Sequence, residues 1–185
     1  MAFLCIYYFN TLKPDDNYLK FWRRFFLLYA GSFIFGGFSH LLFHYTSMPG
    51  KIPGWTCALL GVTSAEWAMT FQFDKPQKIR ILIVLKLLFS LILLVVDFKF
   101  LWVMLHTTGL LFFVCLPSIS KWIRGLFNFK YFVYAIFFLL LTAPIKLLKV
   151  DFHPAYFNRD DISHVFIIIS IALIFKGVRS TVDVS

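Results

Sequence analysis

Charged side chains are scarce in this sequence, and acidic side chains are the scarcest of all. Asp, Glu, Lys and Arg together make up 15% of the 185 residues, with 9 acidic against 18 basic side chains. Charged residues make up about 25% of an average soluble domain, which needs them to keep its surface in water. The low charge therefore excludes an ordinary soluble enzyme, and we expect lipid to surround most of the chain.

Cysteine is also rare. The three cysteines, Cys5, Cys57 and Cys115, each fall in an apolar segment, and no two of them have CxxC spacing. This pattern excludes a disulfide framework and a cysteine zinc site. We interpret all three as small buried apolar side chains.

Long apolar segments fill most of the chain, which is 60% hydrophobic and 21% aromatic. A membrane-spanning helix needs ~20 predominantly apolar residues. Six segments approach this length, separated by Pro, Gly and charged residues. We therefore predict an all-α, polytopic membrane helix bundle that forms one domain over residues 1–185. The predicted helices are about 25–46, 55–73, 79–97, 100–117, 129–148 and 161–178.

The first ten residues, MAFLCIYYFN, are apolar but too short to span a membrane. They are either part of a truncated seventh helix or a short interfacial piece.

The net charge of +9 would suggest nucleic-acid binding in a soluble protein. Here the basic residues alternate between the loops. One set of predicted loops carries twelve of the 18 lysines and arginines, and the alternate set carries five. Basic residues concentrate in cytoplasmic loops. We therefore expect no nucleic-acid partner, and a location in the bacterial cytoplasmic membrane with residues 11–24 and the C-terminus in the cytoplasm.

Histidines and aspartates gather toward the outer ends of the predicted helices. His40 and His44, like Asp160 and His164, are four residues apart, so each pair lies on one helix face. Neutral imidazole and carboxylate are ligands of catalytic zinc sites that keep one position open for water. We expect a zinc site here, with Asp160 or Asp161 as ligand or general base. Its predicted ligands are His40, His44, His106 and His164.

The alternative is that the same residues have only structural roles. Asp160 or Asp161 would cap the last helix, and the histidines would form hydrogen bonds between helices near the membrane interface.

Glu66 and Lys86 are charged residues inside two consecutive apolar segments. At a rise of ~1.5 Å per residue, each lies about 10 Å from the cytoplasmic end of its helix. Charges within a membrane usually pair or line a cavity, so we predict a Glu66–Lys86 ion pair below the histidines. The alternative is that Lys86 extends to the membrane interface. The segment of Glu66 is also rich in small and hydroxyl side chains, which favours the bundle interior.

Two short stretches resemble a known superfamily. GGFSHLLFH (Gly36–His44) is similar to the early histidine helix of the superfamily that joins alkaline ceramidases and progestin/adipoQ receptors. DDISHVF, at residues 160–166, resembles the HxxxH opening of its last helix, with Asp160 in place of the first histidine. The last helix is also similar to that of a family of small bacterial membrane proteins. The resemblance implies a seven-helix membrane protein that binds zinc through three histidines and, in some members, hydrolyses lipid amides.

The leading functional hypothesis is a metal-dependent hydrolase of a lipid amide or ester, with membrane lipids as its surroundings and its substrate class. The alternative is a non-catalytic integral membrane subunit that packs against partner subunits in a larger complex. A transporter is a third hypothesis, in which Glu66 and Lys86 lie on a proton path.

Overall fold

The computed structural model describes residues 1–42, 45, 47–148 and 159–182. Every regular element in this part of the chain is a helix, and it contains no strand, which confirms the all-α prediction. The chain forms two compact units, Met1–Phe113 and Val114–Ser185. The predicted single domain stays a prediction.

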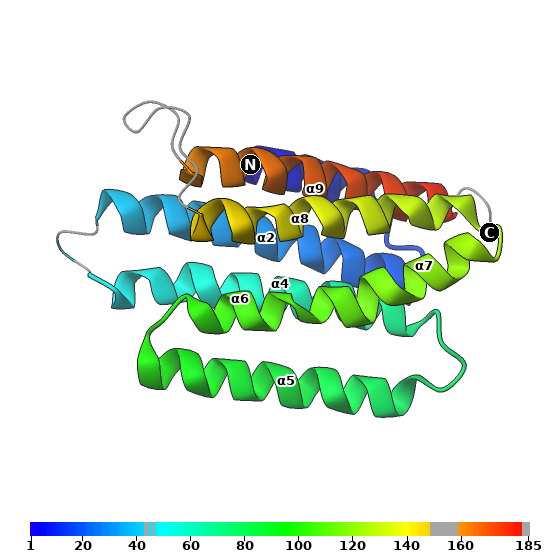
Figure 1. Ribbon diagram of the computed structural model, residues 1–185, viewed down its shortest axis with the longest axis horizontal. Helices are drawn as coiled ribbons and strands as arrows, with labels where there is room; N and C mark the ends of the chain where they lie inside the picture. The colour runs from blue at the N-terminus through cyan, green and yellow to red at the C-terminus, as the bar shows by residue number, and fades with distance from the viewer. Residues whose placement is uncertain (43–44, 46, 149–158, 183–185) are drawn as a thin grey trace. The chain divides into compact units, whose positions relative to one another are not determined.

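The described part of the first unit contains five α-helices, and each of them packs against the next one along the chain. α2 (Asn17–Leu41) packs against α1 (Ala2–Thr11) and against α4 (Ile52–Thr70). α4 in turn packs against α5 (Pro76–Asp97) and α6 (Leu101–Thr107). Short connections make consecutive helices run in opposite directions, as the blue to green ribbons show (Figure 1). A short helix, η1 (Pro49–Lys51), leads into α4.

Glycines of α2 and α4 allow these two helices to approach closely. A Cβ atom on Gly54 would lie 3.1 Å from the backbone nitrogen of Gly36 and 3.2 Å from the carbonyl oxygen of Ser32. A Cβ atom on Gly61 would lie 2.7 Å from the ring of Tyr29. These contacts confirm the predicted interior position of the segment that carries Glu66, which is itself fully buried.

Two helix boundaries differ clearly from those predicted, and the others shift by a few residues. α2 begins at Asn17 rather than near residue 25, because the Asp16 side chain accepts a hydrogen bond from the Leu19 N–H and caps the helix. The break predicted at Pro117 is absent. The chain passes through a π-helical turn, η2 (Leu111–Cys115), and Pro117 then lies in the first turn of α7 (Leu116–Ile123), where its missing N–H costs little.

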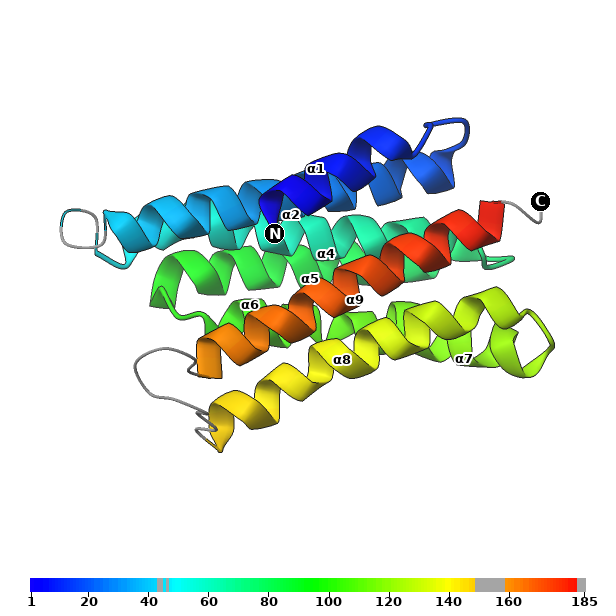
Figure 2. The ribbon, with the colours of Figure 1, turned by 90° about the horizontal axis from the view of Figure 1, so that it is seen from above.

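The second unit is built on a pair of antiparallel helices. α8 (Lys130–Leu147) follows the short helix η3 (Phe127–Phe129) and packs along α9 (Arg159–Val182), the yellow and red ribbons of Figure 2. Phe138 stacks on Phe166, with ring centroids 5.9 Å apart. A Cβ atom on Gly177 would lie 3.1 Å from the ring of Phe132, so this glycine brings the two helices together.

Four helical stretches are long and apolar enough to cross a membrane: Pro76–Asp97, Leu101–Ile123, Phe127–Ile145 and Asp161–Thr181. α5 exposes apolar side chains along most of its length, as expected for a helix in lipid. Its buried positions include Ser90, whereas Leu82, Phe89 and Val96 on its other faces are more than half exposed. The protein is therefore an integral membrane protein by the length and composition of its helices.

The predicted number of six spans is not confirmed. α2 and α4 are present as helices in the first unit, but they do not reach the apolar content of a membrane span. α2 carries Lys20, Arg23 and Arg24 in its first two turns, and α4 carries Glu66 with several hydroxyl side chains.

Candidate functional site

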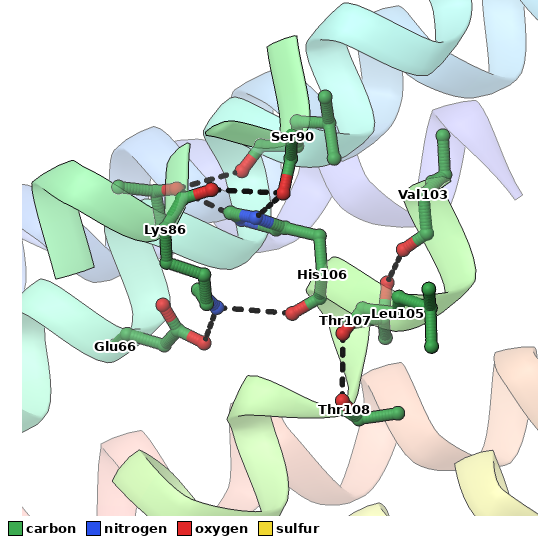
Figure 3. A network of polar contacts seen from close by, with 10 residues as sticks. Glu66, Lys86, Ser90, Val103, Leu105, His106, Thr107 and Thr108 are labelled. Carbon is green, nitrogen blue, oxygen red and sulfur yellow. Dashed lines mark hydrogen bonds and ion pairs between the residues drawn. The ribbon is translucent and has the colours of Figure 1, made fainter. Parts of the chain in front are cut away.

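An ion pair lies in the interior of the first unit, between α4 and α5. The Glu66 side chain is fully buried and that of Lys86 is 22% exposed. The Lys86 ammonium donates a hydrogen bond to Glu66 Oε1 and a second one, 2.9 Å long, to the carbonyl oxygen of His106 on α6 (Figure 3). The predicted Glu66–Lys86 pair is thus confirmed, and one lysine side chain connects three helices.

The His106 ring lies beside this ion pair, with only 1% of the residue exposed. Its Nδ1 is 3.0 Å from Ser90 Oγ and its Nε2 is 3.1 Å from Thr63 Oγ1. The Ser90 and Thr63 hydroxyls also lie within 2.9 Å of the carbonyl oxygens of Lys86 and Leu59, to which they donate. α4, α5 and α6 each contribute polar groups, and we call Glu66, Lys86, Ser90, His106 and Thr63 the polar cluster.

The two hydroxyl groups decide which ring nitrogens of His106 donate and which accept. If both hydroxyls donate to carbonyl oxygens, both ring nitrogens must donate, and the imidazole is protonated. If one hydroxyl turns its hydrogen toward the ring, the imidazole is neutral. The ring hydrogens of His106 and the orientations of the two hydroxyl groups therefore depend on each other.

The helix after His106 is irregular where it passes the ion pair. The Thr107 and Thr108 hydroxyls donate to the carbonyl oxygens of Val103 and Leu105, and the π-helical turn η2 follows within a few residues. Such back-bonding bends helices, and π-turns are frequent at functional sites. A Cβ atom on Gly109 would lie 2.1 Å from Lys86 Nζ and 2.3 Å from Glu66 Oε1. Any larger residue at this position would force the charged ends of Lys86 and Glu66 to move.

The second carboxylate oxygen of Glu66 is available for a ligand. Glu66 Oε2 is buried and has no hydrogen-bond partner among the residues that the structure describes. A buried polar atom without a partner costs about 1–3 kcal/mol, and more when it is charged. A proton on Oε2, or a donor group beside it, would remove this cost.

The residues predicted to bind zinc lie in different surroundings. His40 on α2 and His164 on α9 are exposed, and Asp161 is half-buried. His106 was predicted level with His40, but its ring contacts Thr63 and Ser90 in the layer of the Glu66–Lys86 pair. The prediction of its depth was therefore wrong.

The zinc prediction itself stays a prediction. His44 and the side chain of Asp160 lie outside the described residues. Within the described part of the chain, no three His, Cys, Asp or Glu side chains come together as metal ligands.

Ser90 and Gly109 are site residues that the sequence interpretation missed. Ser90 follows Lys86 by four residues, and Gly109 follows His106 by three, so each pair lies on one helix face. The sequence His106-Thr107-Thr108-Gly109 interrupts an otherwise apolar segment. Polar residues at these spacings in three consecutive helices were the signal that could have revealed the polar cluster.

No curated protein and no solved structure matches the chain. Residues 1–183 match a family of unknown function, DUF6962. This match covers nearly all of the 185 residues. The chain is therefore a member of the DUF6962 family.

Proposed function

We propose that this protein is a proton-coupled membrane transporter in which Glu66 is the proton-binding residue. The observation that carries the proposal is the buried Glu66–Lys86 ion pair, packed against Gly109 at an irregular stretch of helix. Ionisable residues inside membrane bundles are costly, and they mark ion and proton pathways. Irregular helices at such residues are a common feature of transporter sites.

The chemistry of a proton-binding step follows from the two carboxylate oxygens of Glu66. Oε1 accepts a hydrogen bond from Lys86, and Oε2 has no partner among the described residues. A proton that binds Oε2 neutralises the carboxylate and weakens its attraction for the Lys86 ammonium. Lys86 then keeps its hydrogen bond to the His106 carbonyl and its position 5.7 Å from the centre of the Phe113 ring. Loss of the proton restores the pair.

The test is proton flux into liposomes that contain the purified protein and a pH-sensitive dye. Glu66→Gln alone leaves Lys86 charged and unpaired, so the informative variant is Glu66→Gln/Lys86→Met, which removes both charges together. We expect the double variant to insert and fold but to lose flux. The matched control is Asp97→Asn/Lys99→Gln, which removes the surface ion pair of 2.8 Å at the C-terminal end of α5 and should keep its flux. Full flux in the Glu66→Gln/Lys86→Met variant would contradict the proposal.

A membrane hydrolase is a second candidate, favoured by the exposure of His40 and His164. Exposed imidazoles can reach a metal ion directly, so this candidate rests on His40 and His164, with Asp160 or Asp161 as base, and not on the buried ring of His106. Stoichiometric zinc in purified protein, lost in His164→Ala, would support this candidate. Metal-free protein that is fully folded would exclude it.

A third candidate is a non-catalytic subunit of a membrane complex, which the exposed apolar faces of α5 also suit. This candidate would be favoured over both others if wild-type protein showed no proton flux and a stable partner co-purified with it.

We further propose that α2 and α4 cross the membrane with the other four helices and that the C-terminus is cytoplasmic. The concentration of basic residues near the start of α2 and the start of α5 supports this orientation. Reporter fusions placed after η1 and after α9 should report opposite sides of the bacterial cytoplasmic membrane. Reporters on the same side would overturn the six-span topology.

A further inference from the structure

We infer that Arg80 holds the phosphate group of an anionic phospholipid at one end of the first unit. This end is formed by the start of α2, the end of α4 and the start of α5, and the α1–α2 and α4–α5 connections both lie there (Figures 1 and 2). The inference rests on the membrane insertion of the protein, and it is independent of proton binding at Glu66.

Arg80 is held in one orientation by contacts on two sides. Its Nε donates a 3.0 Å hydrogen bond to Thr70 Oγ1, and the Thr70 hydroxyl donates in turn to the Trp67 carbonyl oxygen. The guanidinium carbon lies 4.8 Å from the centre of the Phe71 ring and 5.4 Å from that of Trp67. Thr70 is fully buried, so the residue that orients Arg80 is itself fixed.

This orientation leaves the terminal nitrogens of Arg80 for a ligand. A guanidinium has five N–H donors, of which Nε carries one and the two terminal nitrogens carry the others in a planar fork. No carboxylate lies within ion-pair distance of Arg80 in the part of the chain that the structure describes. A planar fork matches two oxygens of a phosphate group and binds them with parallel hydrogen bonds.

The aromatic side chains beneath Arg80 extend to a second arginine. Phe21 of α2 stacks on Trp67 at 5.8 Å, with 26° between the ring planes, and contacts Phe71 at 6.0 Å. The Arg24 guanidinium carbon lies 4.9 Å from the centre of the Phe21 ring. Phe21, Trp67 and Phe71 therefore support two guanidinium groups, one from α2 and one from α5.

The charge of this end selects an anionic ligand. Among the described residues, none of its cations is within ion-pair distance of a carboxylate, and Asp16 is already used to cap α2. Basic residues that face an anionic leaflet each gain about 1 kcal/mol from its surface potential. The cations here are Lys13, Lys20, Arg23, Arg24, Lys75, Lys78 and Arg80, and the carboxylates are Asp15, Asp16 and Asp74.

The depth of Arg80 points to a lipid phosphate as the occupant. α5 begins at Pro76 and is one of the helices apolar enough to cross a membrane. At ~1.5 Å per residue, Arg80 lies about 6 Å from the start of this helix, which is headgroup level. Tryptophan is enriched at the same depth, and Trp67 occupies it here.

The test measures the binding constant of phosphatidylglycerol relative to phosphatidylcholine in mixed bilayers. Brominated lipids that contact the protein quench tryptophan fluorescence, and Trp67 lies in the aromatic group beneath Arg80. We expect wild-type protein to prefer phosphatidylglycerol. Arg80→Gln should lower this preference about tenfold, which corresponds to about 1.4 kcal/mol. Arg80→Lys should lose most of the same preference, because lysine keeps the charge but lacks the planar fork.

Lys78→Gln is the matched control, because it removes one positive charge from an exposed side chain two residues away. It should change the preference less than twofold. Equal losses in Lys78→Gln and Arg80→Gln would show general surface attraction and overturn the Arg80 site. Loss of the wild-type preference on addition of inorganic phosphate would instead assign the site to a soluble anion and overturn the lipid proposal. Circular dichroism of each variant confirms that the protein is folded.

Discussion

Gly109→Ala is the smallest change that should disrupt the polar cluster. The new Cβ atom would lie 2.1 Å from Lys86 Nζ and 2.3 Å from Glu66 Oε1, whereas ordinary van der Waals contact begins at 3.4 Å. Both charged atoms would have to move by more than an ångström. Lys86 has some freedom to move because its side chain is 22% exposed, but Glu66 is fully buried and would remain without its counter-charge.

The size of the effect follows from two opposing contributions. Breaking a buried ion pair costs about 3–5 kcal/mol when one charge stays buried. Replacing a helical glycine with alanine returns about 1 kcal/mol through the lower entropy of the unfolded chain. We therefore expect Gly109→Ala to lower the free energy of unfolding by about 2–4 kcal/mol.

Reversible unfolding in mixed micelles with increasing SDS, followed by circular dichroism, measures this difference. The matched control is Gly37→Ala on α2, where a Cβ atom would have no neighbour within 4 Å. The control should be as stable as wild type or slightly more stable. In the Glu66→Gln/Lys86→Met background, Gly109→Ala should cost at least about 1 kcal/mol less, because neighbouring substitutions that share contacts are not additive.

Equal stabilities of Gly109→Ala and Gly37→Ala would contradict the close approach of the ion pair to Gly109. That result would mean that the ion pair does not pack against Gly109 and that the irregular helix has another cause.

Three further changes test other parts of the structure by the same unfolding measurement. Ser90→Ala removes the hydroxyl 3.0 Å from His106 Nδ1 and should lower the free energy of unfolding by about 1–3 kcal/mol, because the buried ring loses a partner. The control is Ser180→Ala, at a half-buried hydroxyl of α9, which should lower it much less. Gly61→Ala places a Cβ atom 2.7 Å from the Tyr29 ring and should cost about 1–3 kcal/mol by forcing α2 and α4 apart, so unchanged stability would contradict their close packing. Asp16→Ala removes the cap of α2 and should cost about 0.5–2 kcal/mol, whereas Asp15→Ala, one residue earlier in the connection, should have little effect.

The fold class could be predicted from the sequence because lipid and helix geometry leave few alternatives. It was also predictable that Glu66 and Lys86 lie at the same depth in the membrane. Each is about equally far in residues from the same end of two consecutive, antiparallel predicted helices. Hydropathy alone could not decide the number of spans. α2 and α4 pack along each other but fall short of the apolar content of a span, so a count by helix length gives six spans and a count by apolar content gives four.

The position of His106 could not be predicted from its place in one helix. Its depth depends on the register between α5 and α6, which the contacts of Lys86 and Ser90 with His106 set. The irregular turn at Thr107–Gly109 was also hidden, because a glycine within an apolar segment is usually a packing residue. Here the glycine leaves space for two charged groups, which becomes visible only when the neighbouring helices are placed.

The proposed function requires Glu66 to gain and lose a proton inside the membrane. Infrared difference spectroscopy of the protein in lipid, recorded between two pH values, detects this change at the carboxyl group itself, because a protonated carboxyl has its own C=O stretching band. We expect such a band in wild-type protein and its loss in the Glu66→Gln/Lys86→Met variant, with the Asp97→Asn/Lys99→Gln control unchanged. A difference spectrum with no band that depends on Glu66 would contradict it.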